Sequence, residues 1–142
     1  HSPTMYPDFE NIVSNGELGK NLINDMSWVN NEFLPIVQQR GKAVIDSRGA
    51  SSATSAAKAA LDTVVACENP TRPGECFSAA VITDGSYGLP DGIICGMPLM
   101  TTSDGNVEIV RDIALSEFAK EKIKISTNEL IEERSAVEDL LK

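Results

Sequence analysis

The sequence has 142 residues, 42% of them hydrophobic, which is enough for one domain with a buried core. Its 21 acidic residues outnumber its 12 basic residues, so the formal net charge is -9. Clustered Lys and Arg bind phosphate backbones and anionic lipids, so this charge argues against a nucleic-acid partner and a membrane partner. Because the sequence shows no membrane-spanning apolar run and no secretory signal, we expect a soluble cytoplasmic protein.

The first predicted elements are a surface loop and a pair of helices. Polar, turn-forming residues at 14–21 predict the loop. A helix is expected to begin at Asp25 or Ser27, either of which can cap its first amides. Pro35 falls inside the helical pattern, where it lacks an N–H and crowds the preceding turn. We therefore expect a short helix near 27–33 and a second helix that begins at Pro35.

The second of these helices carries an apolar side that Gly41 interrupts, at a cost of about 1 kcal/mol relative to alanine. Close packing against another helix is the simplest explanation of this glycine. Arg48-Gly49-Ala50 is expected to end the helix, and Ser51 or Ser52 to cap the next one. The apolar stripe of that next helix is mostly alanine, which allows its backbone to approach a neighbour closely.

The period then changes to that of β-strands. Residues 77–83 form the first predicted strand, and 93–100 and 107–110 flank the turn Ser103-Asp104-Gly105-Asn106, a good hairpin signal. Pro98 has no N–H for a sheet ladder, so its strand is expected at an edge or beside a bulge. Three antiparallel strands packed against the helices follow from this pattern.

The last segment, from Leu115 onward, has the apolar spacing of a helix. Ser126-Thr127-Asn128-Glu129 matches a capping box, which predicts a break in that helix. A group of acidic residues is expected to form its solvated face. They are Glu129, Glu132, Glu133, Glu138 and Asp139.

The three cysteines, Cys67, Cys76 and Cys95, do not have the spacing of metal ligands, so no metal site is expected. Cys67 and Cys76 flank a loop that a disulfide could close. Without a secretory signal, three reduced thiols packed as small hydrophobic groups are the preferred interpretation.

The one histidine of the chain is His1, in the proline-rich segment 1–8. An imidazole titrates near neutral pH and is therefore a natural proton shuttle. Read without its context, a histidine at a chain end is more often part of a disordered terminus or a purification remnant.

Five segments change that interpretation. They are His-Ser-x-Thr-x-Tyr-Pro-Asp at 1–8, Ser27-Trp28, Gln38-Gln39-Arg40-Gly41, Ser51-Ser52-Ala53-x-Ser55-Ala56-Ala57-Lys58-Ala59 and Ser86-Tyr87-Gly88-x-Pro90. In this order they resemble the C-terminal half of cytosolic-type, NAD-dependent malate dehydrogenases, in the lactate/malate dehydrogenase superfamily. The resemblance runs over 1–142. It implies one α+β domain, with helices packed on a small antiparallel sheet, one long bent C-terminal helix and no Rossmann domain.

The resemblance also implies an activity and its residues. The family transfers hydride between malate and NAD, giving oxaloacetate and NADH, a reaction of the tricarboxylic acid cycle. His1 matches the catalytic histidine, a general base toward the malate hydroxyl and a general acid in reverse. Gly41 matches the point where its helix passes the substrate pocket, and Ser51 matches a residue that lines it. The start of a helix also favours an anionic substrate.

Several parts of such an enzyme are absent. The chain has no Gly-x-Gly-x-x-Gly fingerprint for a dinucleotide. In the family, the aspartate that orients the histidine and the arginines that bind the substrate all precede it in the sequence. We therefore expect NAD to be bound mainly by a missing N-terminal half, and the isolated chain to be inactive. The expected partners are malate or oxaloacetate, that coenzyme-binding half, and a second copy in a homodimer.

Two alternatives stay open. The first is a fragment of a related 2-hydroxy acid dehydrogenase, such as a lactate dehydrogenase. The second is a non-catalytic assembly or dimerisation module, with which the alanine-rich helix face and the apolar C-terminal helix are compatible.

Overall fold

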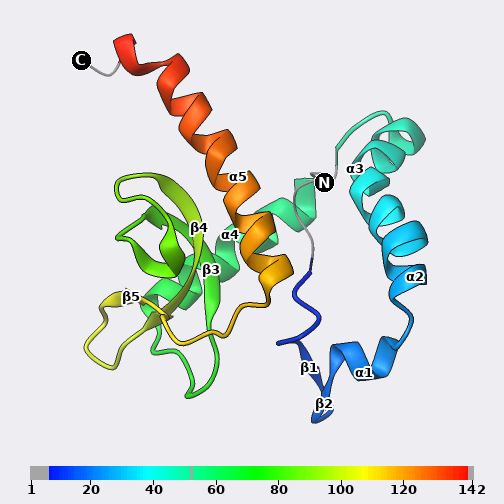
Figure 1. Ribbon diagram of the computed structural model, residues 1–142, viewed down its shortest axis with the longest axis horizontal. Helices are drawn as coiled ribbons and strands as arrows, with labels where there is room; N and C mark the ends of the chain where they lie inside the picture. Colours follow the sequence, from blue (N-terminus) through cyan, green and yellow to red (C-terminus); the bar gives the residue numbers. More distant parts are fainter. Residues whose placement is uncertain (1–6, 52, 141–142) are drawn as a thin grey trace. The chain divides into compact units, whose positions relative to one another are not determined.

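The computed structural model describes residues 7–51 and 53–140. These residues form two compact units. The first unit contains 7–51 and 114–126, and the second contains 53–113 and 127–140. Figure 1 shows the order of the elements along the chain. None of the helices formed by the described residues is both long and apolar enough to cross a membrane.

The first unit begins with a hairpin, so the predicted surface loop at 14–21 is wrong. Strand β1 (Val13–Ser14) pairs antiparallel with β2 (Glu17–Leu18), and helix α1 (Gly19–Ile23) follows. The turn residues Asn15 and Gly16 have φ values of 51° and 83°. Asn-Gly is the pair that favours a two-residue turn with left-handed backbone at both positions. This turn signal outweighs the polarity of the segment.

The long helix of the first unit is continuous, which corrects the predicted separation at Pro35. Three stretches follow one another without a gap: α2 (Met26–Trp28), the π-helical turn η1 (Val29–Phe33) and α3 (Leu34–Arg48). Asp25 is confirmed as the N-cap, because its carboxylate accepts the Trp28 N–H at 2.9 Å.

The π-helical turn explains how a proline fits into this helix. Leu34 donates its N–H to the carbonyl of Val29, five residues earlier instead of four. The wider turn relaxes the packing just before Pro35, which stands at the start of α3. As predicted, α3 ends at Gly49, whose φ of 70° lets its N–H bond back to the Ile45 carbonyl.

The second unit packs a helix on a three-stranded antiparallel sheet, which confirms the predicted α+β class (Figure 1). The sheet order is β3-β4-β5, and α4 packs against β3 and β4. Met97, Leu99 and Thr101 of β4 are buried at 1–2% exposure and form the core of this layer. The elements are α4 (Ala53–Glu68), β3 (Phe77–Ile82), η2 (Ser86–Gly88), β4 (Ile94–Thr101) and β5 (Val107–Ile109).

Pro98 lies in the central strand, so the predicted edge or bulge position is wrong. It pairs with Ser78 of β3 on one side, and on the other its carbonyl accepts the Val110 N–H at 2.9 Å. The nitrogen and carbonyl of one residue point to the same side of a strand. The missing N–H of Pro98 therefore faces the Val110 carbonyl, one residue beyond β5, where the ladder with β5 ends.

The C-terminal helix α5 (Glu117–Ala136) passes through Ser126–Glu129 without a break, and η3 (Glu138–Leu140) follows it. The break predicted from the capping box is therefore wrong, and the single long helix implied by the resemblance is confirmed. Helix-favouring residues on both sides of the pattern extend the helix, and Thr127 is buried at 6% exposure within it. The acidic residues of 129–139 are all exposed, which confirms the solvated face.

Candidate functional site

The structure describes two of the three predicted site residues. Gly41 lies half-buried in the middle of α3, and Ser51 is exposed, two residues before α4 begins. Both belong to the first unit. His1 lies outside the described residues. The described chain that follows the histidine begins at Pro7 and continues into a turn at Asp8.

Polar contacts hold this turn, which covers residues 8–12. The Asp8 carboxylate accepts the backbone N–H of Glu10 at 3.2 Å and the side-chain amide of Asn11 at 2.5 Å. The same Asn11 amide nitrogen also donates to the carbonyl of Ala114 at 2.9 Å, across 103 residues of sequence. Both hydrogens of one carboxamide are therefore committed, one within the turn and one to the segment before α5.

An aromatic cluster of Phe9, Phe33 and Trp28 holds the same turn. The rings of Phe9 and Phe33 meet edge to face, with centroids 6.1 Å apart and planes at 63°. Phe33 lies in the π-helical turn and also contacts Trp28, at a centroid distance of 5.3 Å. Such ring pairs stabilise by about 0.5–1.5 kcal/mol beyond their buried area. The chain just after the histidine segment is thus packed on the helix that carries Gly41.

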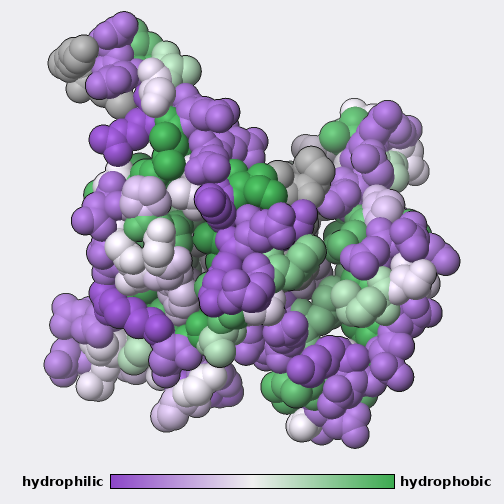
Figure 2. Space-filling view, in the orientation of Figure 1, coloured by the Kyte–Doolittle hydropathy of each residue, from purple (hydrophilic) through white to green (hydrophobic). Residues whose placement is uncertain are grey.

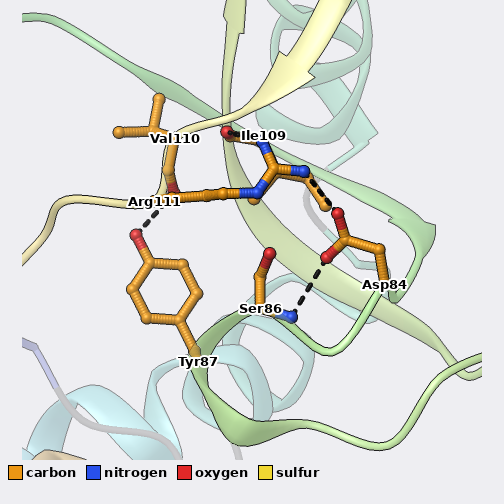
Figure 3. A network of polar contacts seen from close by, with 6 residues as sticks. All are labelled: Asp84, Ser86, Tyr87, Ile109, Val110 and Arg111. Atoms are coloured by element: carbon orange, nitrogen blue, oxygen red, sulfur yellow. Dashed lines mark hydrogen bonds and ion pairs between the residues drawn. The ribbon is translucent and has the colours of Figure 1, made fainter.

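A second polar group lies in the second unit, after β3 (Figure 3). Asp84 pairs with Arg111 and accepts the Ser86 N–H at 3.1 Å. Hydrogen bonds from the Ser86 side chain and backbone, followed by that from Arg111, lower the pKa of Asp84 to about 2. Arg111 is thereby engaged within its own unit.

Tyr87 completes this group from an unusual backbone conformation. Its φ of 57° is left-handed, a region that non-glycine residues seldom adopt. Its hydroxyl donates to the Val110 carbonyl at 2.5 Å (Figure 3). The same carbonyl faces Pro98, which has no N–H. Burial is the main cause that raises the pKa of this phenol. The tyrosine thus supplies the hydrogen bond that the proline leaves unmade.

Thr83 closes the loop that carries Tyr87. Its buried hydroxyl donates to the Pro90 carbonyl at 2.5 Å and accepts the Ile93 N–H at 3.0 Å. The strained backbone at Tyr87 is therefore fixed from several directions, as strained residues generally require. The sequence pattern predicts only that a strand ends before Asp84, and it gives no signal for Asn11. No local pattern identifies either partner, because each acts across more than 25 residues.

The described residues form neither a dinucleotide-binding fold nor a cluster of metal ligands. A dinucleotide fold requires parallel strands and a glycine-rich turn at a helix start, whereas both described sheets are antiparallel. In the described part of the chain, no three His, Cys, Asp or Glu residues lie close enough to hold a metal ion. The three cysteines are free thiols.

A groove of about 540 Å³ lies in the second unit and contains none of the predicted site residues. Two of its lining residues are Ile93, which is buried, and Arg134, which donates to the Gly92 carbonyl at 3.2 Å. The residues that line it are Pro90, Asp91, Ile93, Ile131, Arg134, Ser135 and Glu138.

Comparison with known proteins gives a family model and several solved structures. Residues 1–140 match the model of the lactate/malate dehydrogenase, alpha/beta C-terminal domain. The chain is 41% identical to the malate dehydrogenase of Naegleria fowleri, with a TM-score of 0.82, covering 96% of this chain and 41% of that one. It is 25% identical to the malate dehydrogenase of Salinibacter ruber, with a TM-score of 0.76, covering 100% of this chain and 46% of that one.

A lactate dehydrogenase of Trichomonas vaginalis, solved with NADH and oxamate, shares the fold at a TM-score of 0.80. Its identity is 24%, over 97% of this chain and 43% of that one. The chain therefore spans less than half the length of these similar structures.

Proposed function

Because the chain belongs to the lactate/malate dehydrogenase C-terminal domain family, we propose that residues 1–142 are the substrate-side domain of a malate dehydrogenase. The observation that carries this proposal is the 41% identity to a malate dehydrogenase over 96% of the chain. The identity to the Trichomonas vaginalis lactate dehydrogenase is 24% and supports the fold alone. The reaction would be the reversible oxidation of malate to oxaloacetate, with NAD as the second substrate.

In this proposal His1 moves the proton. Oxidation of the malate hydroxyl to a ketone releases a proton, which a neutral imidazole within hydrogen-bond distance accepts. In the reverse direction the imidazolium polarises the ketone of oxaloacetate and returns the proton. Ser51, just before α4, would line the pocket beside a helix start, where backbone N–H groups favour a carboxylate. Gly41 would leave room for the substrate beside α3.

We further propose that this chain requires a coenzyme-binding half. The described residues do not form a dinucleotide site, so NAD would be bound mainly outside this chain. The aspartate that orients the histidine and the arginines that bind the substrate would come from the same half. The isolated chain would therefore be inactive, and the assembled enzyme would be a cytoplasmic homodimer.

An NADH-linked oxaloacetate assay tests the proposal. We expect no turnover from the chain alone, and turnover when a separately produced coenzyme-binding half of a malate dehydrogenase is added. In that mixture His1→Asn should lower the rate about 10²- to 10⁴-fold, the usual contribution of a general acid–base group. Asn21→Ala, an exposed change in α1, is the matched control. Clear turnover by the chain alone, or no turnover in the mixture, would contradict it.

One observation favours a second function, a non-catalytic assembly module. Hydrophobic side chains reach the surface in several places (Figure 2). On α4, Leu61, Val64 and Val65 are 65%, 59% and 59% exposed. An apolar helix face of this kind is typical of a surface that a partner covers. Sedimentation velocity of the purified chain would show a concentration-dependent dimer in this case, and a monomer at all concentrations would count against it.

A further inference from the structure

Strand β3 forms one edge of the three-stranded sheet, with β4 on its inner side. Just beyond its end, the Thr83 N–H donates to the Ile93 carbonyl at 2.8 Å, on the side of β4. In an antiparallel ladder, alternate residues direct both of their backbone groups toward the same neighbour. The N–H and carbonyl groups of Ser78, Ala80 and Ile82 therefore point away from β4, along the outer edge of the sheet.

The register on the other side of β4 agrees with this direction. The Pro98 carbonyl accepts the Val110 N–H, so the backbone groups of Pro98 face β5 and not its β3 partner, Ser78. Outside the ladder with β4, the described part of the chain gives the backbone groups of Ser78, Ala80 and Ile82 no partner, and all three residues are exposed. The edge therefore presents three N–H donors and three carbonyl acceptors.

This edge lacks the features that normally prevent further pairing. Natural edge strands carry a charged residue, a proline, a bulge or a covering segment. Strand β3 (Phe77–Ile82) has no charged residue and no proline, and it pairs one-to-one with β4 without a bulge. At its end, Ile82 is 68% exposed. An edge of this kind can accept a further strand through its backbone groups.

We propose that β3 pairs antiparallel with β3 of a second copy of this chain, which joins the two sheets into one of six strands. The proposal specifies the surface of the assembly module proposed above and rests on that function. A two-fold axis at Ala80 places Ala80 opposite Ala80 of the other copy, and Ser78 opposite its Ile82. Each opposed pair then exchanges two N–H···O bonds, so every outward backbone group of the three residues has a partner.

The distribution of charge favours contact at this edge. Each copy carries a net charge of -9, so two copies repel each other over most of their surfaces. Strand β3 itself is uncharged. In the proposed register the carboxylate that follows it, Asp84, lies opposite Cys76 of the other copy and not opposite another acid. Two copies can therefore meet here without opposed like charges.

Helix α4 adds area to an interface that two strands alone would leave small, since stable interfaces bury about 1,200–2,000 Å². Because α4 packs against β3 and β4, the two-fold axis places both α4 helices on the same face of the joined sheet. Each helix axis lies about one strand spacing from the two-fold axis, so the two are about 10 Å apart, near the distance of packed helices. The exposed Leu61, Val64 and Val65 supply apolar area for this contact.

Two variants of Ala80 and one control test the edge. Ala80→Pro removes the N–H at the two-fold axis, and because this N–H points away from β4, the ladder within the chain keeps its bonds. Ala80→Lys places two like charges opposite each other across the axis. Ile94→Lys is the matched control, since it makes the same change of charge on the same sheet face, at 67% exposure, but in the central strand. Far-UV circular dichroism and urea midpoints check that each variant stays folded.

Sedimentation velocity should show a concentration-dependent dimer of the wild-type chain, with twice its mass of 15.2 kDa. Ala80→Pro should raise the dissociation constant about ten- to hundredfold, the effect of losing one hydrogen bond from each copy. Ala80→Lys should raise it most at low salt, where like charges are screened least. Ile94→Lys should leave it nearly unchanged.

Amide hydrogen exchange measured by NMR locates the contact within β3. In dilute solution the N–H groups of Ser78, Ala80 and Ile82 should exchange rapidly, whereas those of Ala79 and Val81, which face β4, should exchange slowly. At concentrations at which the dimer forms, the three outward amides should become protected as well.

The possible failures separate this interface from the assembly function. A wild-type chain that stays monomeric at all concentrations would overturn both. A dimer that both Ala80 variants leave unchanged, or that Ile94→Lys weakens equally, would overturn the β3 interface and leave the assembly function standing. Protection of the outward amides only after a coenzyme-binding half is added would make that half the occupant of the edge, and would overturn pairing with a second copy.

Discussion

The pairing of Tyr87 with Pro98 leads to a sharp test of how the central strand is stabilised. The Val110 carbonyl faces Pro98, which has no N–H, and accepts the Tyr87 hydroxyl at 2.5 Å instead. Tyr87→Phe keeps the ring and removes only this donor. A net hydrogen bond contributes about 0.5–1.5 kcal/mol, and a buried acceptor left unpaired costs about 1–3 kcal/mol. Since Val110 is half-buried, we expect a loss of about 1–2 kcal/mol in the free energy of unfolding.

Tyr87→Phe should destabilise the protein less when a backbone N–H is available at position 98. Pro98→Ala restores a backbone N–H that faces the Val110 carbonyl, so this acceptor keeps a partner when the hydroxyl is removed. A double-mutant cycle isolates the interaction between the two positions from their separate effects. We expect Tyr87→Phe to destabilise the Pro98→Ala protein by about 0.5–1 kcal/mol less than it destabilises the wild type.

Urea unfolding followed by circular dichroism at 222 nm measures all four proteins. Unchanged m-values across the set would show that the variants change stability rather than the extent of unfolding. Ser103→Ala, at an exposed position of the β4–β5 turn, is the control. If Tyr87→Phe costs the same in both backgrounds, the tyrosine does not replace the missing proline donor and the reasoning is refuted.

Three further changes test other contacts of the second unit. Because the folded pKa of Asp84 is about 2, below the ordinary aspartate value of 3.8, its stabilisation is present above about pH 4 and is lost as the pH falls toward 2. Asp84→Asn should therefore make the stability fall less steeply with acid, which urea midpoints measured from pH 5 to pH 2 would show. An unchanged fall would assign the acid sensitivity to other carboxylates. Gly85→Ala places a Cβ 3.1 Å from an Asp91 carboxylate oxygen, at a backbone φ of 83° that alanine seldom adopts. The change should lower the free energy of unfolding by about 1–2 kcal/mol, which thermal unfolding would show as a midpoint several degrees lower. A midpoint equal to that of the wild type would show that the loop adjusts freely. Thr101→Val keeps the volume of a side chain with 1% exposure but removes its 2.7 Å hydrogen bond to the Ala66 carbonyl. Urea titrations should show a free energy of unfolding lower by about 1–2 kcal/mol. An unchanged free energy would mean that this carbonyl needs no partner.

Local chemistry determined much of this fold, and those parts follow from the sequence alone. Asp25 caps its helix, Gly49 ends it, and the Asp104-Gly105 turn joins two strands, because each effect acts within a few residues. The five family segments likewise indicated the domain family from the order of their residues. The sequence pattern likewise predicts Gly41 within a helix and Ser51 just before the next one, where the structure has them. The roles of both residues stay predictions.

Tertiary structure decided the features in which local rules compete with distant partners. Pro98 occupies a central strand because a tyrosine 11 positions earlier along the chain replaces its donor. Pro35 lies in a continuous helix because a π-helical turn precedes it. Helix α5 continues through the capping-box pattern at 126–129, where Thr127 is buried. Asn11 gives no signal in the sequence, since its partner is a backbone carbonyl 103 residues away. Bonds to backbone atoms over such separations carry no residue-type pattern, so only the folded chain specifies them.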